Sequence, residues 1–261
     1  TDVAQITTFN TNLAALTNSD TVQSFGIVLG TASPYELAAV LTANNISPAS
    51  PTYAATVNAI ANVLSTGLYT TAQIADALGI TQARQIQPTA ENLEAVVALV
   101  ETGTPAAQIT PAQVSLVQSL VDFIATHFNT ISTFVKVQTA AILAAANIAL
   151  TNPSLSTIVS AVASILTLGL FTPAEVSAAV KTIQQINQAN PSNPIMPITQ
   201  TNLTAVISLQ AAGVTVTDVA QITTFNTNLA ALTNPQTLAD SNIVLGTASP
   251  YELAAVLTAN N

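Results

Sequence analysis

The stretches TDVAQITTFNTNLAALTN and IVLGTASPYELAAVLTANN each occur twice, at residues 1–18 and 217–234 and at residues 27–45 and 243–261. The complete segments, 1–45 and 217–261, align without a gap and differ at seven positions, all between residues 19 and 26 of the first copy. The period is therefore 216 residues. Identity over this length excludes chance, and we expect the chain to be a window cut from a longer tandem array.

A second and more diverged duplication lies within the 216-residue unit. PTYAATVNAIANVLSTGLYTTAQIADAL, from Pro51, resembles PSLSTIVSAVASILTLGLFTPAEVSAAV, from Pro153, and NLEAVVALVETG, from Asn92, matches NLTAVISLQAAG, from Asn202. We therefore expect three parts: residues 1–50 as the C-terminal part of a second-type module, 51–152 as a first-type module and 153–261 as a second-type module. Self-similar helical modules typically stack, so the predicted architecture is a solenoid-like or bead-like tandem array.

Helix start and stop signals recur along the chain and predict an all-α fold. Five Ser or Thr residues are followed three positions later by Glu or Gln, the pattern of a capping box, and four of them precede a proline. These predicted N-caps are Ser33, Thr70, Thr110, Thr172 and Ser249. Apolar residues between them follow helical spacing, as in the series Leu155, Ile158, Val159, Val162 and Ile165. Five glycines are expected where helices end: Gly67, Gly79, Gly103, Gly169 and Gly213.

The surface is predicted to be almost free of charge. Only 6% of residues are charged, against about 25% in typical soluble proteins. Three cations face twelve carboxylates, giving a formal charge of −9, which excludes electrostatic binding to nucleic acid or to an anionic membrane. No apolar stretch is long enough to span a bilayer and no signal peptide is expected, so membrane insertion is not predicted.

The residues that carry catalytic or metal chemistry in other proteins are scarce. Cysteine is absent and His127 is the only histidine, so a packing or capping role is expected for it. Glu91, Glu94 and Glu101 share one helix face, which indicates a solvated face, with a divalent-cation site as the alternative. The matching helix of the second-type module lacks these carboxylates, and we predict no catalytic residue, metal site or cofactor.

Two short patterns and one loop remain. Asn45 and Asn202 begin Asn-X-Ser/Thr sequences and are weak candidates for N-glycosylation. The loop QANPSNPIMP, residues 188–197, carries three prolines and is predicted to be a rigid spacer, with a recognition loop as the alternative.

Near-identical units of low charge can repeat one contact along an axis, and a contact that does not close into a ring generates a filament. We therefore expect a non-enzymatic structural protein of an extracellular fibre, sheath, surface layer or matrix, whose partners are copies of itself. The alternative is the stalk or spacer of a large cell-surface adhesin. Both place the chain outside the cell or on its surface, where three trypsin-sensitive residues in 261 would be an advantage.

Overall fold

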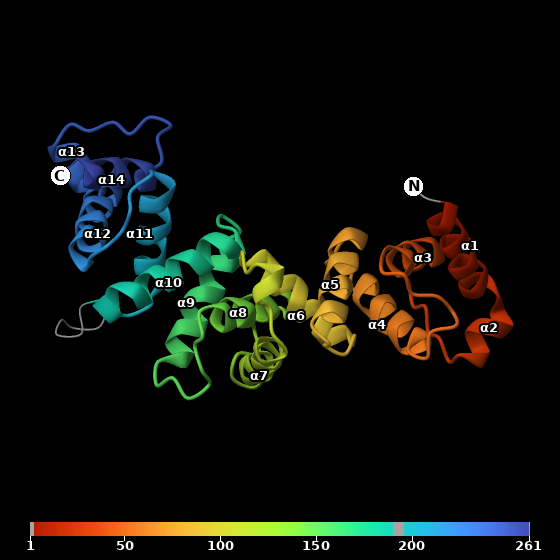
Figure 1. The fold of residues 1–261 in the computed structure, drawn as a ribbon. Coiled ribbons are helices and arrows are strands. Elements are labelled where there is room, and N and C mark those ends of the chain that lie inside the picture. The colour runs from red at the N-terminus through yellow and green to blue at the C-terminus, as the bar shows by residue number, and fades with distance from the viewer. Residues whose placement is uncertain (1–2, 190–195, 261) are drawn as a thin grey trace. The chain divides into compact units, whose positions relative to one another are not determined.

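The computed structural model describes residues 3–189 and 196–260, and over these residues its regular secondary structure is helical, with no strand (Figure 1). The predicted all-α class is therefore confirmed. The chain divides into two compact units, residues 1–144 and 145–261. This division follows compactness, whereas the module bounds at residues 50/51 and 152/153 follow sequence similarity and stay predictions.

The first unit contains seven complete helices, a short 3₁₀ turn and nearly all of an eighth helix. In chain order these are α1 (Val3–Thr17), α2 (Ser19–Ser24), α3 (Pro34–Ala43), α4 (Tyr53–Ser65), α5 (Thr71–Ala83), α6 (Ala90–Glu101), η1 (Ala106–Gln108), α7 (Pro111–His127) and α8 (Thr133–Ala145). Helix α1 packs on α3, and α3 packs on α4 and α5. Helix α6 contacts α4, α5 and α7, which makes it the centre of this unit.

The second unit contains the remaining helices. They are α9 (Leu155–Leu168), α10 (Pro173–Ala189), α11 (Gln200–Ala211), α12 (Val219–Thr233), α13 (Pro235–Asp240) and α14 (Pro250–Ala259). Helix α11 contacts α9, α10, α12 and α14, the position that α6 has in the first unit, and α12 packs on α14 as α1 packs on α3. Residues 190–195 of the loop at 188–197 lie outside the described residues. The role predicted for this loop is therefore not tested.

Side-chain hydrogen bonds cap the N-termini of several helices. Thr70 and Thr110 each accept a hydrogen bond from the backbone N–H three residues on and return one from their own N–H to Gln73 or Gln113. Ser33 forms the same reciprocal box with Glu36, and Thr172 with Glu175. Such bonds satisfy N–H groups that a helix start leaves unpaired.

Ser249 is the N-cap residue of α14, as predicted, but it makes no side-chain capping bond, so the capping box expected there is not formed. The loop before Ser33 is held by side chains of α4, whereas no side chain among the described residues bonds in this way to the loop before Ser249. Gly79 does not end a helix but lies inside α5, where a Cβ atom would come within 3.0 Å of the Asn44 side-chain oxygen. Close approach of α3 and α5, and not a helix end, explains this glycine.

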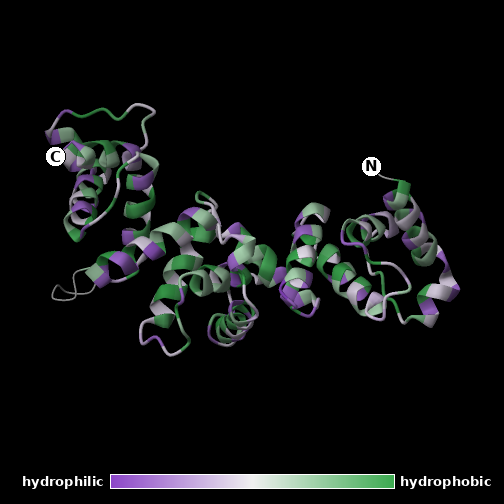
Figure 2. Ribbon diagram, in the orientation of Figure 1, coloured by the Kyte–Doolittle hydropathy of each residue, from purple (hydrophilic) through white to green (hydrophobic). Residues whose placement is uncertain are grey.

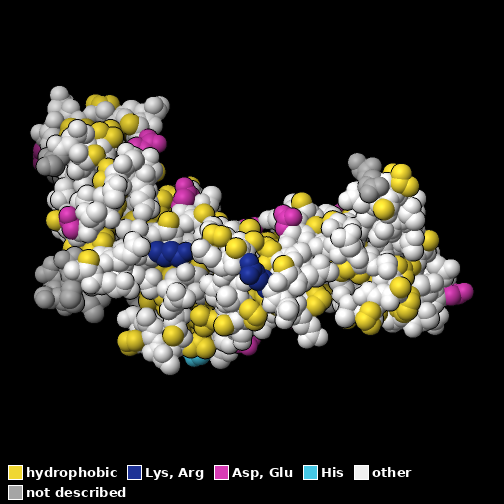
Figure 3. All heavy atoms as spheres, viewed as in Figure 1, with side chains coloured by type: hydrophobic (Ala, Val, Ile, Leu, Met, Phe, Trp, Pro, Cys, Tyr) yellow, Lys and Arg dark blue, Asp and Glu magenta, His cyan; other side chains and the backbone are white. Residues whose placement is uncertain are grey.

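Threonine is abundant in these helices although its helix propensity is modest. Along α1 and α12 the hydroxyls of threonines donate to the carbonyl four residues earlier, as Thr7 does to Val3 at 2.9 Å and Thr223 to Val219 at 3.0 Å. Hydroxyls satisfied in this way make a polar surface without charge. Figure 2 shows hydrophilic and hydrophobic residues interspersed on the helices. On the face drawn in Figure 3, charged side chains are isolated among uncharged ones.

Candidate functional site

The duplicated segment has different neighbours in its two positions. We call residues 1–45 the N-terminal copy and residues 217–261 the C-terminal copy. Their helices begin and end at equivalent residues, because α1, α2 and α3 match α12, α13 and α14 at an offset of 216. A matched comparison of burial in the two copies therefore identifies the surface that each neighbour covers.

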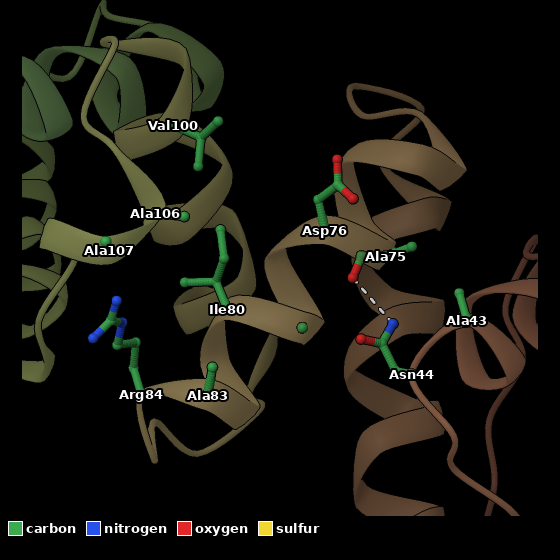
Figure 4. A pocket seen from close by; sticks show the side chains of 11 residues that line it. Ala43, Asn44, Ala75, Asp76, Ile80, Ala83, Arg84, Val100, Ala106 and Ala107 are labelled. Carbon is green, nitrogen blue, oxygen red and sulfur yellow. Dashed lines mark hydrogen bonds between the residues drawn. The ribbon is translucent and has the colours of Figure 1, made fainter.

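In the N-terminal copy, α4 and α5 cover one side of α3. Val40 and Leu41 are fully buried there. The Asn44 side-chain amide donates to the Ala75 carbonyl of α5 at 3.0 Å, a bond drawn in Figure 4. Together with the close approach at Gly79, this bond fixes the end of α3 against α5.

The loop before α3 is held by α4. Asn58 of α4 accepts from the Val28 N–H at 2.8 Å and donates to the Gly26 carbonyl at 3.1 Å. Ser65, the last residue of α4, accepts from the Thr31 N–H at 3.2 Å. The backbone of this loop is thus hydrogen-bonded to two polar side chains of α4.

In the C-terminal copy the same residues are uncovered. Val256 and Leu257, which match Val40 and Leu41, are 53% and 47% exposed. Ile243 is 44% exposed, whereas its match in the other copy is buried. At Gly246 an added Cβ would meet nothing within 4 Å, but at the matching Gly30 it would lie 2.7 Å from the Ser65 hydroxyl.

The opposite side of the segment shows the reverse difference. Ile222 and Phe225 of α12 are fully buried, and α12 packs on α11. The matching Ile6 is 50% exposed and Phe9 is half-buried in the N-terminal copy. Each copy therefore has one covered side and one open side, and the two open sides are different.

An apolar groove borders the open side of α14. It has a volume of about 600 Å³ and is formed by residues at the end of α9, along α11 and along α14, including Leu168, Leu170, Phe171, Tyr251 and Val256. Leu168 and Leu170 are 52% and 70% exposed, so the groove presents apolar side chains to solvent. The groove adds apolar area to the uncovered surface of α14.

A second hollow lies between α3, α5 and the end of α6 (Figure 4). It has a volume of about 530 Å³ and is lined largely by alanines, with Asp76, Ile80 and Arg84 as larger side chains. No residue of this lining is a histidine, serine or threonine, and its two ionisable side chains are Asp76 and Arg84. It is best described as a groove left by small side chains.

The predicted glutamate face is partly engaged in packing. Glu101 accepts hydrogen bonds from Gln73 of α5, at 2.6 Å, and from Gln138 of α8. Burial, with Glu94 and Glu101 nearby, raises the pKa of Tyr69, and burial together with Glu91 raises the pKa of Glu94. Glu91 is exposed, as expected for a solvated face, but Glu101 ties three helices together, which its spacing alone did not predict.

His127 is the last residue of α7. Its ring Nδ1 lies 2.8 Å from the Phe123 carbonyl and its ring stacks on Phe123 with the centroids 4.2 Å apart. This is the local capping contact of a helix C-terminus. Within residues 3–189 and 196–260, no group of three or more His, Cys, Asp or Glu side chains is placed to hold a metal ion.

The two glycosylation candidates differ in their surroundings. Asn45 is exposed in a left-handed turn after α3, with φ of 54°. Asn202 is half-buried, donates to the Pro197 carbonyl at 3.0 Å and accepts from Asn226 at 3.2 Å. A glycan on Asn202 would replace one of the two hydrogens on the side-chain nitrogen that makes the first of these bonds.

Asn92 of α6 makes the same set of contacts as Asn202 of α11. The Asn92 N–H donates to the Thr89 hydroxyl, its amide donates to the Gln87 carbonyl at 2.8 Å, and its side-chain oxygen accepts from Gln118. The two helices match in sequence, but their N-caps, Thr89 and Thr199, were not predicted, since neither precedes a Glu or Gln at the third position. The signal that could have identified these N-caps is the asparagine three positions after each threonine, whose side chain bonds back to the preceding loop.

None of the helices described here is long and apolar enough to cross a bilayer. Comparisons of the chain with protein-family models, with curated proteins and with solved structures find no match.

Proposed function

We propose that the chain is a structural, non-enzymatic protein whose first-type and second-type modules stack in a tandem array. In this proposal the array forms an extracellular fibre, sheath, surface layer or matrix, and its partners are copies of itself and neither nucleic acid nor membrane lipid. The single observation that carries the proposal is the pair of matched segments, because each copy buries the side that the other leaves open. A segment with two such sides is a connector between modules.

The uncharged surface supports lateral association of such arrays. Few charged side chains oppose contact between neighbouring threads, and the threonine and asparagine side chains can hydrogen-bond between them. Stacking within one chain gives a thread, and lateral packing of threads gives a fibre. The low content of Lys and Arg also limits cleavage by trypsin-like proteases, which fits a place outside the cell.

Electron microscopy of chains that carry one, two or three 216-residue units tests this proposal. We expect the length of the particle to increase by a constant amount with each added unit, and the longer chains to associate side by side into regular filaments. Isolated rods at all concentrations would favour the adhesin stalk instead. A length that does not increase in constant steps would contradict stacking.

A further inference from the structure

The uncovered side of the C-terminal copy exposes apolar side chains that are buried in the N-terminal copy. We define it as the α14 face: Ile243, Val244, Gly246, Val256, Leu257 and Asn260. Ile243, Val256 and Leu257 are 44%, 53% and 47% exposed, and a partner that covered them would remove this apolar area from water. Val244 belongs to the face through its backbone N–H, because the side chain of the matching Val28 stays 68% exposed beside α4. The matching residues of the N-terminal copy show which partner this is.

We infer that the α14 face binds a second copy of the helix pair α4–α5, joined to α14 as residues 46–83 are joined to α3. This inference rests on the proposed stacking and deepens it by naming the interface and its occupant. The sequence of the face is identical to that of the α3 face which the pair already covers. Identical side chains on identical helices can make identical contacts.

The polar groups on the face match those of the occupant. In the N-terminal copy Asn44 donates to the Val40 carbonyl and, with its second N–H, to Ala75 of α5. Asn260 donates to the Val256 carbonyl at 2.7 Å, the match of the first bond. The docked pair would supply the acceptor for the other N–H, and its Asn58 would bond to the Val244 N–H.

The seven differences between the copies remove little of this interface. Asn242 replaces Gly26, but both have a left-handed φ, of 54° and 63°, so both present their carbonyl to Asn58 in the same way. Ser241 stands where the N-terminal copy has Phe25. The C-terminal copy therefore cannot make the edge-on ring contact that Phe25 makes with Tyr53. The remaining contacts involve residues that are the same in both copies.

The occupant is a first-type pair and not a second-type pair. A Cβ atom added at Gly79 would lie 3.0 Å from the side-chain oxygen of Asn44. A larger side chain at this position would therefore collide with Asn44. The second-type pair α9–α10 carries Lys181 at the matching position. The face therefore selects the glycine-bearing pair, which sets the alternation of the two module types.

Covalent continuity is part of the interface. Asn45 takes a left-handed turn that places Ile46 in the core, where its carbonyl accepts from the buried Asn12 at 2.8 Å and its N–H donates to Leu41 at 2.9 Å. A separate chain would not supply Ile46 directly after Asn261, and its α4–α5 pair is already covered by its own α3. A copy joined to α14 supplies Ile46 and has a pair that no other α3 covers.

The test uses thiol labelling, because the chain has no cysteine of its own. Leu257→Cys reports on the α14 face, and Leu41→Cys is the matched control in the same local sequence. In the 261-residue chain we expect Leu257→Cys to react with a maleimide at least about tenfold faster, since Leu41 is fully buried. In a chain extended after Asn261 by residues 46–144, Leu257→Cys should slow to the rate of Leu41→Cys.

The control extension carries Gly79→Lys in the appended segment, and we expect it to leave Leu257→Cys fast. An unchanged Leu257→Cys rate in the unmodified extension would overturn the inference, and protection by the lysine variant would overturn the assignment to the first-type pair. Protection of the unextended chain that grows with its concentration would overturn the joined source in favour of a separate chain. Protection without filaments would retain this interface and contradict only the fibre role.

Discussion

Leucine at the same place in the two copies should contribute unequally to stability. Leu41 is fully buried between α3 and the α4–α5 pair, whereas Leu257 is 47% exposed. Removal of a fully buried leucine side chain costs about 3 kcal/mol, because it loses transfer free energy and leaves a cavity. A half-exposed leucine loses about 1 kcal/mol and leaves no closed cavity. We therefore expect Leu41→Ala to destabilise its unit by about 2 kcal/mol more than Leu257→Ala destabilises the other.

Urea unfolding followed by circular dichroism, with each transition fitted separately, measures this difference. Leu16 and Leu232 provide an internal control, because they match each other and are buried in both copies at 2% and 6% exposure. Alanine at either of them should cost a similar amount. Equal losses for Leu41→Ala and Leu257→Ala, with the control pair also equal, would show that α4–α5 does not protect the α3 face as described.

The remaining predictions concern hydrogen bonds, the titration of Tyr53 and the net charge. Asn12→Ala should cost about 2 kcal/mol because it leaves the buried carbonyl of Ile46 unpaired. Asn228→Ala should cost about 1 kcal/mol, because within the described part of the chain the amide of Asn228 donates only to the Thr258 hydroxyl. Equal unfolding midpoints in urea for the two variants would contradict this. Thr172→Ala should cost about 1 kcal/mol, and Ser249→Ala, with no capping bond, close to nothing, both read from thermal melting. Tyr53→Phe should cost less than about 0.5 kcal/mol at pH 7, since the hydroxyl is buried with no hydrogen-bond partner among the described residues. Burial raises the pKa of Tyr53 from 10.0 to about 12. The stability that the neutral Tyr53 side chain contributes is therefore present below pH 10 and is lost as the pH rises toward 12. Equal losses of stability between pH 10 and pH 12 in the wild type and in Tyr53→Phe would oppose this. Finally, the net charge of −9 falls toward zero near the pI of about 4.1, so light scattering should rise as pH drops from 7 to 4, and a flat signal would exclude charge repulsion as the barrier to association.

The helical class could be predicted because local signals agree with the final structure. Thr70 and Thr110 start helices through bonds to a residue three positions on, and no distant residue is needed for them. Ser249 has the same local pattern without the bond, because support from α4, which the matching loop has, is missing there. Local patterns are reliable where the flanking loop is held and less so where it is open.

Tertiary roles could not be read from the sequence. Gly79 has the appearance of a helix end, but its cause is the nearness of Asn44, which is 35 positions away. Glu101 was expected on a solvated face and instead accepts from two glutamines of other helices. The open α14 face was also hidden, because the two copies have the same sequence and only their neighbours distinguish them. The repeat did supply the matched pair on which that comparison depends.

An experimental structure of the chain continued by a second copy of residues 46–261 tests the stacking of modules most directly. We predict that Val256 and Leu257 are buried against the second α4–α5 pair. The Asn260 amide should then bond to the second Ala75 carbonyl, as Asn44 does at 3.0 Å. A structure in which the α14 face stays open to solvent, with the added helices folded elsewhere, would contradict the tandem stacking that we propose.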